Sequence, residues 1–540
     1  MQLTTIDLII VVVFMLTMLT IGVIVATRKK MTSSNYFLAG RSLPWVLIGA
    51  SLFASNISTI HLVGLCASGY REGLVWGNFE WGAPFILILL GLVFAPFYFK
   101  NRISTLPEFL EKRYSSASRT FLAILGLFTA LMVHIGLSLY AGAVVIEQFF
   151  GLNIYFSIGV ISVIIVIYTV LGGLKAVVIT ETIQSSILVL GAILLTLFAI
   201  RALPDHGIHS YSDLVAAARP NQLNIIPSGD QGRSGFTWYS LLLGYPIIGI
   251  WYWCGDQTIV QRLLGARSAK DAAIGPLFAG FIKILPVLIM VLPGVLGYVM
   301  FKDLIGDNSN EALPVMITRL LPVGIKGILA ASLIAAIMST VSAALNSSGT
   351  LVAVDVFKRL KPSLSDSSLV LIGRISTVVF MILAVMWSTQ GGKFNSIFEA
   401  ANLILSMISP PIATLFVMGV FWRRGTWQAA ISTMILGFVM GAVVFCINFF
   451  NNSFEHWEFA SFIRSFHFLL QGVFMFAICL LNFVIVSYCT PKPRPEQIES
   501  LTLERPLAFL THGKITGITD PRIIAAILVM VMLTLYVIFR

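Results

Sequence analysis

The segment PWVLIGASLFASNISTIHLVGLCASGY, residues 44–70, has the length of a membrane-spanning helix but a polar centre. About 20 predominantly apolar residues are needed to cross the ~30 Å hydrocarbon core of a bilayer. At mid-span, the run ASNIST (54–59) contains four hydrogen-bonding side chains. Non-helical backbone is tolerated at that depth only where it lines a cavity or is buried in protein. The segment therefore predicts a broken membrane helix beside a polar site.

A second span is interrupted in a similar way. Residues 237–262 contain Gly244, Pro246, Gly249 and Gly255, and a proline removes one backbone donor from a helix. We expect this span also to be broken at membrane depth, next to a cavity.

The rest of the chain has the composition of a membrane protein. Of its 540 residues 57% are hydrophobic and 11% are charged, whereas roughly 25% of the residues in a soluble domain are charged. The fold class expected is an all-α membrane protein with about 14 transmembrane helices. The candidate spans are 7–27, 44–70, 76–98, 119–149, 153–172, 181–203, 237–262, 275–301, 323–357, 368–388, 396–422, 427–449, 463–489 and 521–539.

The distribution of positive charge predicts the orientation of these spans. If the N-terminus lies outside, the cytoplasmic loops contain most of the 35 Lys and Arg residues, including the pairs Lys112–Arg113, Lys358–Arg359 and Arg423–Arg424. Cytoplasmic loops of membrane proteins carry such an excess. We therefore expect an integral plasma-membrane protein with both termini outside. The net charge of +11 then reflects topology rather than nucleic-acid binding.

The two interrupted spans are the second and the seventh, so each opens a block of five, 44–203 and 237–422. An odd number of crossings separates equivalent spans, which gives the blocks opposite orientations. Inverted repeats opened by broken helices describe the LeuT-type transporter architecture, with its binding site at the interruptions. Two kinked spans of an unrelated bundle are the alternative. Residues 1–43 would add one helix and a loop, and residues 427–540 three C-terminal helices.

Motifs for enzymatic chemistry are absent from the sequence. It contains neither a G-x-x-x-x-G-K-[ST] nucleotide loop nor an H-E-x-x-H metal motif. The loops are too short to form separate enzymatic domains. A transporter or a channel is therefore expected, and not an enzyme.

Three ionisable side chains in or beside the spans are candidates for the solute site. Glu80 and Lys283 lie inside spans, and His61 follows the first interruption. Charged groups in hydrocarbon are costly and are therefore functional candidates by default. Together the three can donate to and accept from several hydroxyls of one polyol. The alternative is that Glu80 and Lys283 form a structural pair between helices and that His61 is a satisfied core group.

Hydroxyl groups and aromatic rings mark two further candidate sites. Ser339, Thr340 and Ser342 lie in one span, and their oxygens, near carbonyls freed by a broken helix, suit a monovalent cation better than Ca²⁺, which prefers carboxylates. Such residues also pack membrane helices together. The run Trp251–Trp253 lies beside the second interruption, where its rings can stack on a sugar, although aromatic residues also form interfacial belts.

Nine segments in one register resemble the sodium/solute symporter family, most closely its sodium/glucose cotransporter branch. They are YFLAGRSLPW (36–45), ASNIS (54–58), FEW (79–81), LPEFLEKRY (106–114), GGLKAVV (172–178), WYWCGDQTIVQR (251–262), PVGIKG (322–327), ALNSS (344–348) and SPPIATLF (409–416). The resemblance covers about residues 7–450. It implies a sodium-coupled symporter that imports a small polar solute, a sugar such as glucose or galactose. The alternatives are a symporter of myo-inositol, an amino acid or a carboxylate, and a non-coupled uniport carrier or channel.

The resemblance also implies two binding sites. Sodium, the coupling ion, would be held by the backbone carbonyls of Ala54, Ile57 and Ala336 and the hydroxyls of Ser339 and Thr340. The sugar would contact Asn56, His61, Glu80, Trp251, Lys283 and Asn402, with Tyr252 as the inner gate beneath it.

The sequence departs from the family pattern at two positions. Asn402 stands where the glucose branch has Gln, which leaves the side chain one methylene shorter. A second sodium site, present in some relatives, would use Glu181 and Ser342, but Ala343 lacks the hydroxyl that this site requires. We therefore favour one sodium ion per cycle.

Overall fold

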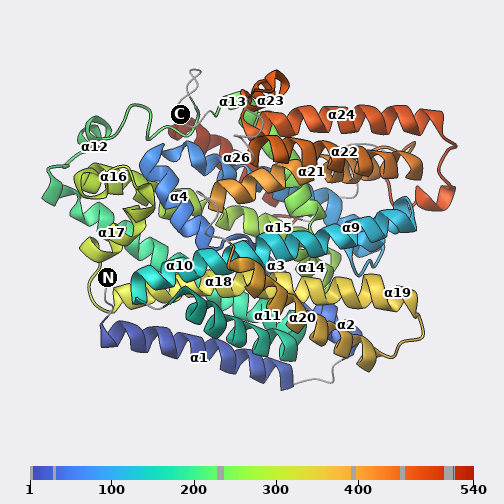
Figure 1. Cartoon of the computed structure of the whole chain (residues 1–540), viewed down its shortest axis with the longest axis horizontal. Coiled ribbons are helices and arrows are strands. Elements are labelled where there is room, and N and C mark those ends of the chain that lie inside the picture. Colours follow the sequence, from blue (N-terminus) through green and yellow to red (C-terminus); the bar gives the residue numbers. More distant parts are fainter. Residues whose placement is uncertain are drawn as a thin grey trace.

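The computed structural model describes residues 4–27, 32–151, 153–227, 236–390, 397–449, 456–503, 515 and 517–540. These residues form a helical assembly in which many long helices run in roughly the same direction (Figure 1). The helices of the first half, including π-helical segments labelled η, are α1 (Thr5–Thr27), α2 (Ser33–Leu38), α3 (Trp45–Asn56), α4 (Thr59–Arg71), α5 (Asn78–Trp81), α6 (Ala83–Leu89), η3 (Leu90–Phe94), α7 (Ala95–Lys100), α8 (Leu106–Arg113), α9 (Ser116–Thr129), η4 (Ala130–Leu137), α10 (Ser138–Phe150), α11 (Ile154–Ala202) and α12 (Tyr211–Ala217).

The second half has the same character. Its main segments are α13 (Trp238–Gly249), η6 (Ile250–Gly255), α14 (Gln257–Leu264), α15 (Ala269–Ile282), η7 (Val287–Val291), α16 (Leu292–Ile305), α17 (Ala312–Leu320), α18 (Ile325–Thr350), η9 (Leu351–Phe357), α19 (Lys358–Leu360), α20 (Asp366–Ser388), α21 (Ile397–Phe421), α22 (Trp427–Phe449), α23 (Glu458–Arg464), α24 (Phe468–Cys489) and α26 (Pro521–Ile538).

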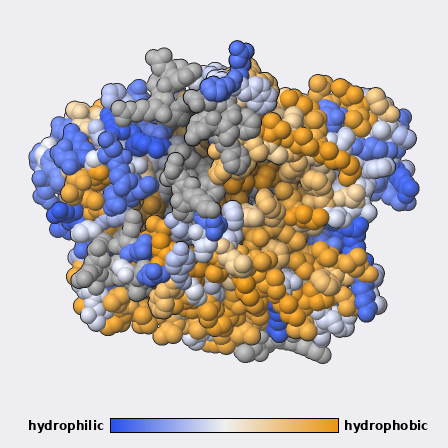
Figure 2. All heavy atoms as spheres, in the orientation of Figure 1, coloured by the Kyte–Doolittle hydropathy of each residue, from blue (hydrophilic) through white to orange (hydrophobic). Residues whose placement is uncertain are grey.

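The surface of the molecule is that of a membrane protein. Apolar residues form a broad band between two polar ends (Figure 2). Of the 18 most apolar consecutive residues in the span Ile325–Leu360, which contains α18, 94% are buried inside the protein. The corresponding shares in α1 and α26 are 22% and 17%. An apolar helix that is buried on all sides belongs to the core of a bundle, and one that exposes its apolar face borders lipid. α18 is therefore central, and α1 and α26 are peripheral.

The expected count of 14 spans is not confirmed. Within the described residues, 11 helices are long and apolar enough to cross a membrane, or 12 if α3 and the following helix are one bent span. Two regions account for the difference. The predicted spans 153–172 and 181–203 form one helix, α11, that is kinked at Gly173 (φ 58°). The predicted span 237–262 is divided among α13, η6 and α14, so that none of the three is long enough alone.

The first broken span is bent by 61° between α3 and the helix that begins after the interruption. α3 ends at Asn56, and the next two residues are extended, with φ/ψ of −82°/108° at Ile57 and −105°/175° at Ser58. Serine, asparagine and threonine side chains compete for backbone hydrogen bonds and so favour helix ends over helix interiors. The polar run therefore forms the break that the sequence predicts.

The second break lies at Asp256 rather than at the proline. α13 continues through Pro246 and passes into the π-helical segment η6. At Asp256 the backbone is extended (φ −88°, ψ 122°), and its Oδ1 accepts a 2.7 Å hydrogen bond from the backbone N–H of Thr258 at the start of α14. Neighbouring helices and local π-helical adjustments let a membrane helix accommodate a proline, and a capping aspartate starts a new helix.

The helices that carry the two breaks pack around α18. α18 packs against α11, α1, α20 and α3, and α3 in turn packs against α15. The helices α22 and α24 pack against α21 outside this core, and α26 packs against α15 and α6. The exact limits of the two five-helix repeats stay a prediction.

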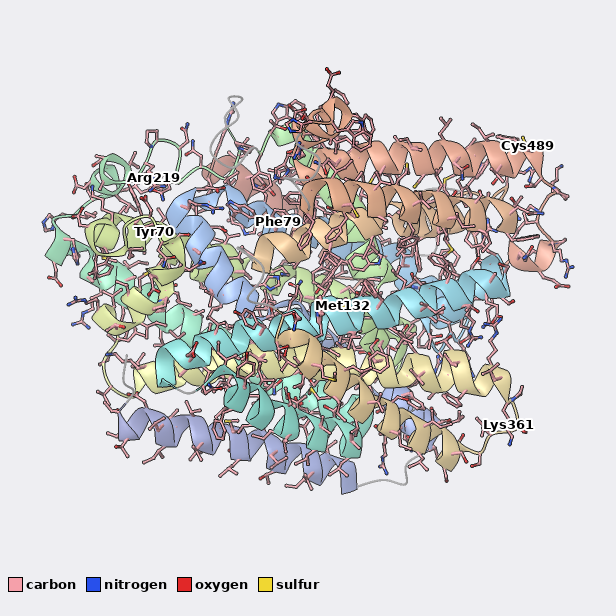
Figure 3. The ribbon with its side chains drawn as sticks, viewed as in Figure 1. Tyr70, Phe79, Met132, Arg219, Lys361 and Cys489 are labelled. Atoms are coloured by element: carbon pink, nitrogen blue, oxygen red, sulfur yellow. The ribbon has the colours of Figure 1, made fainter. Side chains whose placement is uncertain are left out.

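Loops that are predicted to lie on the same side of the membrane lie at the same end of the molecule. Tyr70 and Arg219, predicted outside, are at one end, and Lys361 and Cys489, predicted at the inner side, are at the other (Figure 3). Which end faces the cytoplasm stays a prediction from the charge distribution of the sequence.

Candidate functional site: a solute cavity beside a cage of neutral oxygens

A cavity of about 110 Å³ lies between the two broken spans. One water molecule needs ~10–15 Å³ of such space, so the cavity has room for several waters or for one small polar solute. Six of the seven predicted solute contacts line it. The lining residues are Asn56, Ser58, His61, Phe79, Glu80, Val133, His134, Ser138, Tyr245, Ile248, Gly249, Tyr252, Trp253, Lys283, Thr340, Ala401, Asn402 and Leu405.

Glu80 and Lys283 form an ion pair at the wall of this cavity. The Nζ of Lys283 donates to the Oε2 of Glu80, and their side chains are 1% and 3% exposed. Lys283 also lies over the ring of Trp253, with its Nζ 5.6 Å from the ring centroid. The two residues thus combine both roles considered from the sequence, because they pair with each other between helices and also line the solute cavity.

His61 is oriented by the residue that precedes α4. The backbone N–H of Ser58 donates to His61 Nδ1 at 3.2 Å, and the Ser58 hydroxyl lies 3.1 Å from the same nitrogen. A ring nitrogen that accepts a hydrogen bond carries no proton, so the neutral imidazole carries its proton on Nε2. His61 thereby becomes a donor on the cavity wall.

Asn56, at the end of α3, connects the two broken spans. Its Nδ2 donates to the hydroxyl of Tyr252 at 3.1 Å, while its buried Oδ1 has no hydrogen-bond partner among the residues that the structure describes. A buried polar atom without a partner costs free energy comparable to that of a lost hydrogen bond. The Oδ1 of Asn56 can therefore accept a hydrogen bond from a solute hydroxyl.

Trp251 lies outside the cavity, unlike the other predicted contacts. It lines a separate small pocket together with Asp256, Gln257 and the start of α8, and Trp253 lines the solute cavity instead. The sequence indicated an aromatic run at this point but not which of its rings face the cavity. Because η6 is π-helical, the direction of each ring differs from that in a regular helix. The geometry thus gives Trp251 no contact with a solute in this cavity.

His134 and its partner Asp256 were missed by the sequence analysis. The Nε2 of His134 lies 2.8 Å from the Oδ2 of Asp256, and both side chains are buried. A signal was available, because ionisable residues within membrane spans are functional candidates by default. His134 and Asp256 meet this criterion as Glu80 and Lys283 do.

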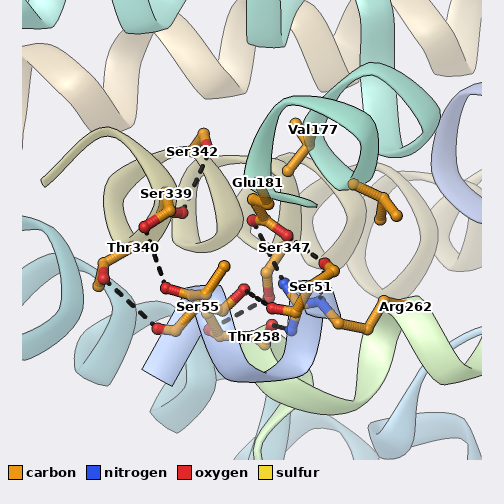
Figure 4. A network of polar contacts seen from close by, with 12 residues as sticks. Ser51, Ser55, Val177, Glu181, Thr258, Arg262, Ser339, Thr340, Ser342 and Ser347 are labelled. Carbon is orange, nitrogen blue, oxygen red and sulfur yellow. Dashed lines mark hydrogen bonds and ion pairs between the residues drawn. The ribbon is translucent and has the colours of Figure 1, made fainter. Parts of the chain in front are cut away.

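The predicted sodium ligands lie where α18 crosses the end of α3 (Figure 4). The Ser339 hydroxyl is 3.0 Å from the carbonyl oxygen of Ala54 and 3.1 Å from that of Ala336, and all three residues are buried. The Thr340 hydroxyl is 3.4 Å from the carbonyl oxygen of Ser55. Unwound carbonyls and helix C-termini coordinate sodium in broken-helix transporters. This neutral oxygen set fits a monovalent cation.

Glu181 lies near this cage but is paired differently. It accepts a hydrogen bond from Ser51, and the guanidinium of Arg262 lies 3.6 Å from its Oε1 (Figure 4). Arg262 also donates to Ser51 at 2.9 Å. Ser342, the other residue of the predicted second sodium site, donates to the carbonyl of Ser339 at 3.1 Å. A protein cation therefore already compensates the charge of Glu181.

Together these features define a class of protein: a membrane transporter of the LeuT-type fold with a polar cavity and an adjacent cluster of neutral oxygens. Residues 36–437 match the sodium:solute symporter family, and the chain belongs to that family. It is 32% identical to sodium/myo-inositol cotransporter 2 of Sus scrofa, over 92% of this chain and 78% of the relative. It is 30% identical to sodium/glucose cotransporter 1 of Oryctolagus cuniculus, over 91% and 80% of the two chains.

The fold also matches a solved structure. A Na⁺-coupled sialic acid symporter in a substrate-bound outward-open state superposes with a TM-score of 0.76 at 22% identity, covering 91% of this chain and 99% of that one. This likeness concerns the fold. The chain is thus an integral membrane protein that couples the transport of a small solute to sodium.

Proposed function

We propose that the chain imports a hexose such as glucose or galactose together with sodium, by alternating access. The observation that carries the proposal is the chemistry of the cavity wall, where Glu80 accepts and Lys283 donates. His61 adds a donor and Asn56 adds an acceptor. Each sugar hydroxyl both donates and accepts a hydrogen bond, so a ring with several hydroxyls can use all of these groups at once.

Sodium binds first in this proposal, between α3 and α18. Its ligands are the carbonyls of Ala54, Ile57 and Ala336 and the hydroxyls of Ser339 and Thr340. Asn56, a solute contact, lies between two of these ligands in the chain, so a bound ion holds it in place for the solute. Such an arrangement is a positive coupling between two ligands, and the coupling is reciprocal. The solute then leaves past Tyr252 toward the cytoplasm, with both termini of the protein outside.

The sodium gradient is sufficient for accumulation with one ion per cycle. A membrane potential of 100 mV contributes about 2.3 kcal/mol per charge, and a tenfold sodium gradient adds ~1.4 kcal/mol. The sum of about 3.7 kcal/mol corresponds to roughly 500-fold accumulation of the solute.

The test is an uptake panel of sugars and polyols in proteoliposomes, with and without an inward sodium gradient. We expect glucose or galactose to accumulate above its external concentration, and the accumulation to collapse when the sodium gradient is dissipated. A channel or a uniport carrier would only equilibrate the solute. Equilibration without accumulation would reject symport of that solute.

Myo-inositol is the second candidate solute. Two observations favour it: a relative that is 32% identical bears the name of a myo-inositol cotransporter, and Asn402 leaves more room than the Gln of the glucose branch. Inositol is also a six-membered ring of hydroxyls, so the same donors and acceptors suit it. Sodium-driven accumulation of inositol without that of glucose would decide for this alternative.

A further inference from the structure

The buried pair of His134 and Asp256 has no role in the transport steps described so far. His134 belongs to the π-helical segment η4, in the middle of the span formed by α9, η4 and α10. Asp256 marks the second helix break and caps α14 through its Oδ1. Its other carboxylate oxygen, Oδ2, lies 2.8 Å from His134 Nε2. The pair thus connects a span of the first block of five to the broken span of the second block.

The pair also separates two spaces. His134 lines the solute cavity, and Asp256 lines a second pocket of about 10 Å³. The second pocket reaches Leu106 and Pro107 at the start of α8, in the loop that is predicted to be cytoplasmic, and its walls include Thr129 and Trp251. Tyr252 lies beside the same pair, with its ring centroid 6.1 Å from that of His134. The pair and Tyr252 therefore join the wall of the solute cavity to the pocket at the start of α8.

The chemistry of the pair suits a closure that can open and close. A hydrogen bond between a carboxylate and an imidazole is stronger than one between two neutral groups. Because it joins only two side chains, it can break without disturbing the backbone of either span. In inverted-repeat transporters, access alternates by movement of one group of helices against the other. Because the two residues belong to different blocks, such a movement changes the distance between them.

We propose that His134 and Asp256 form a latch that closes the inner side of the solute cavity and parts when the solute is released toward α8. This inference rests on the proposed direction of transport. The latch stabilises the states in which the inner side of the cavity is closed. Because it lies beside Tyr252 and at the second helix break, it holds both in place across the solute path.

Four variants test the latch in proteoliposomes: H134A, D256N, the double variant H134A/D256N, and H134K, which keeps a hydrogen-bond donor opposite Asp256. Loss of one hydrogen bond to a charged group corresponds to about a tenfold change in an equilibrium. We expect each single removal to raise the half-saturating sodium concentration for uptake about tenfold and to speed solute efflux. The double variant should change no more than either single variant, and H134K should behave like the unaltered protein.

The control is Asn482→Ala, which removes a half-buried contact between α24 and α22 outside the two blocks, where Asn482 Nδ2 donates to Ser432 and Thr433 at 3.0 and 2.9 Å. It should leave sodium dependence and efflux unchanged. Unaltered sodium dependence and efflux in both H134A and D256N would overturn the latch. Fully additive effects in the double variant would also overturn it, because they would mean that the two residues do not act as one pair.

A labelling experiment keeps the latch testable if those variants do not fold, or if the transported solute is not a hexose. Thr129→Cys introduces a thiol into the wall of the second pocket, and the unaltered chain gives the background from its own cysteines. We expect a thiol reagent to modify Cys at this position several-fold more slowly with sodium alone than without sodium, because sodium favours the inner-closed state. Modification at the same rate in both conditions would overturn the latch, whereas failure of hexose uptake alone would reject only the proposed solute.

Discussion

Two buried acid–base pairs in this protein have similar composition and different surroundings. Glu80 and Lys283 pair at the wall of the solute cavity. Glu181 and Arg262 pair beside the cation cage, where Ser51 bonds both partners and the guanidinium also donates to the carbonyls of Thr258 and Ile259. The first pair has an adjacent space into which a solute can bring new hydrogen bonds. The second does not line that cavity, and its members bond Ser51 and two backbone carbonyls, so we interpret the first as functional and the second as structural.

The largest effect is expected at the cavity pair. Glu80→Gln or Lys283→Ala leaves a buried charge without its partner, which costs about 3–5 kcal/mol, and also removes a charge-assisted contact to the solute. We expect the initial rate of sodium-driven hexose uptake to fall at least about 100-fold in each variant. The double replacement Glu80→Leu/Lys283→Met leaves no unpaired charge, but it also removes the polar contacts to the solute, so it should be inactive as well. Recovery of uptake in that double variant would show that the pair is structural only.

The next largest effect concerns the cage beside α3. Ser339→Ala and Thr340→Ala each remove one proposed sodium ligand, and the loss of such a polar contact corresponds to ~1–3 kcal/mol. We expect the half-saturating sodium concentration to rise ten- to a hundredfold while the protein stays folded. Ser348→Ala is the matched control, because within the described part of the chain this buried hydroxyl of α18 bonds only its own helix, at the carbonyl of Ala344. Normal sodium activation in both cage variants would remove the assignment.

A smaller effect on transport is expected at the Glu181–Arg262 pair. Glu181→Gln leaves Arg262 with its bonds to Ser51 and to two carbonyls but without a counter-charge. The variant should lose thermal stability. Its sodium activation should change less than about threefold, because the proposed sodium ligands do not include Glu181. The ratio of isotopic sodium flux to solute flux should be one, both before and after the substitution. A ratio of two that falls to one in Glu181→Gln would instead assign a second sodium site to Glu181.

The smallest effect is expected at the wall position where the chain departs from its family. Asn402 lines the cavity, and Asn402→Gln restores the longer side chain of the glucose branch. We expect hexose affinity to be preserved or improved by up to about fivefold, the lower end of what one buried hydrogen bond provides. If the native solute is bulkier, its uptake should fall while glucose uptake rises. An uptake panel that is unchanged for every solute would mean that position 402 does not contact it.

The sequence was most informative where polar residues interrupt apolar spans. The run at 54–59 predicted the first break because few causes other than a site explain hydrogen-bonding side chains at membrane depth. Pro246 was misleading, since a membrane helix can pass through a proline, and the actual break is set by a capping aspartate ten residues later. Hydropathy located the helices, and the kink of α11 at Gly173 falls between the two spans that were predicted there.

The site was predictable in its residues but not in its contacts. Glu80, Lys283 and His61 stood out because each is ionisable and lies in or beside an apolar span, and six of the seven predicted solute contacts do line one cavity. The π-helical segments η4 and η6 rotate the side chains that follow, so sequence spacing could not distinguish Trp251 from Trp253 or bring His134 to Asp256. Pairings between distant spans, such as Arg262 with Glu181, depend on packing that no local pattern encodes.

The central claim is that sodium prepares the cavity for the solute, and calorimetric binding to the purified protein tests it most directly. Hexose affinity would be measured at saturating sodium and again with sodium replaced by choline, and sodium affinity with and without hexose. We expect sodium to raise hexose affinity at least about tenfold and hexose to raise sodium affinity by the same factor, because the coupling is reciprocal. Equal hexose affinity in sodium and in choline would contradict the account.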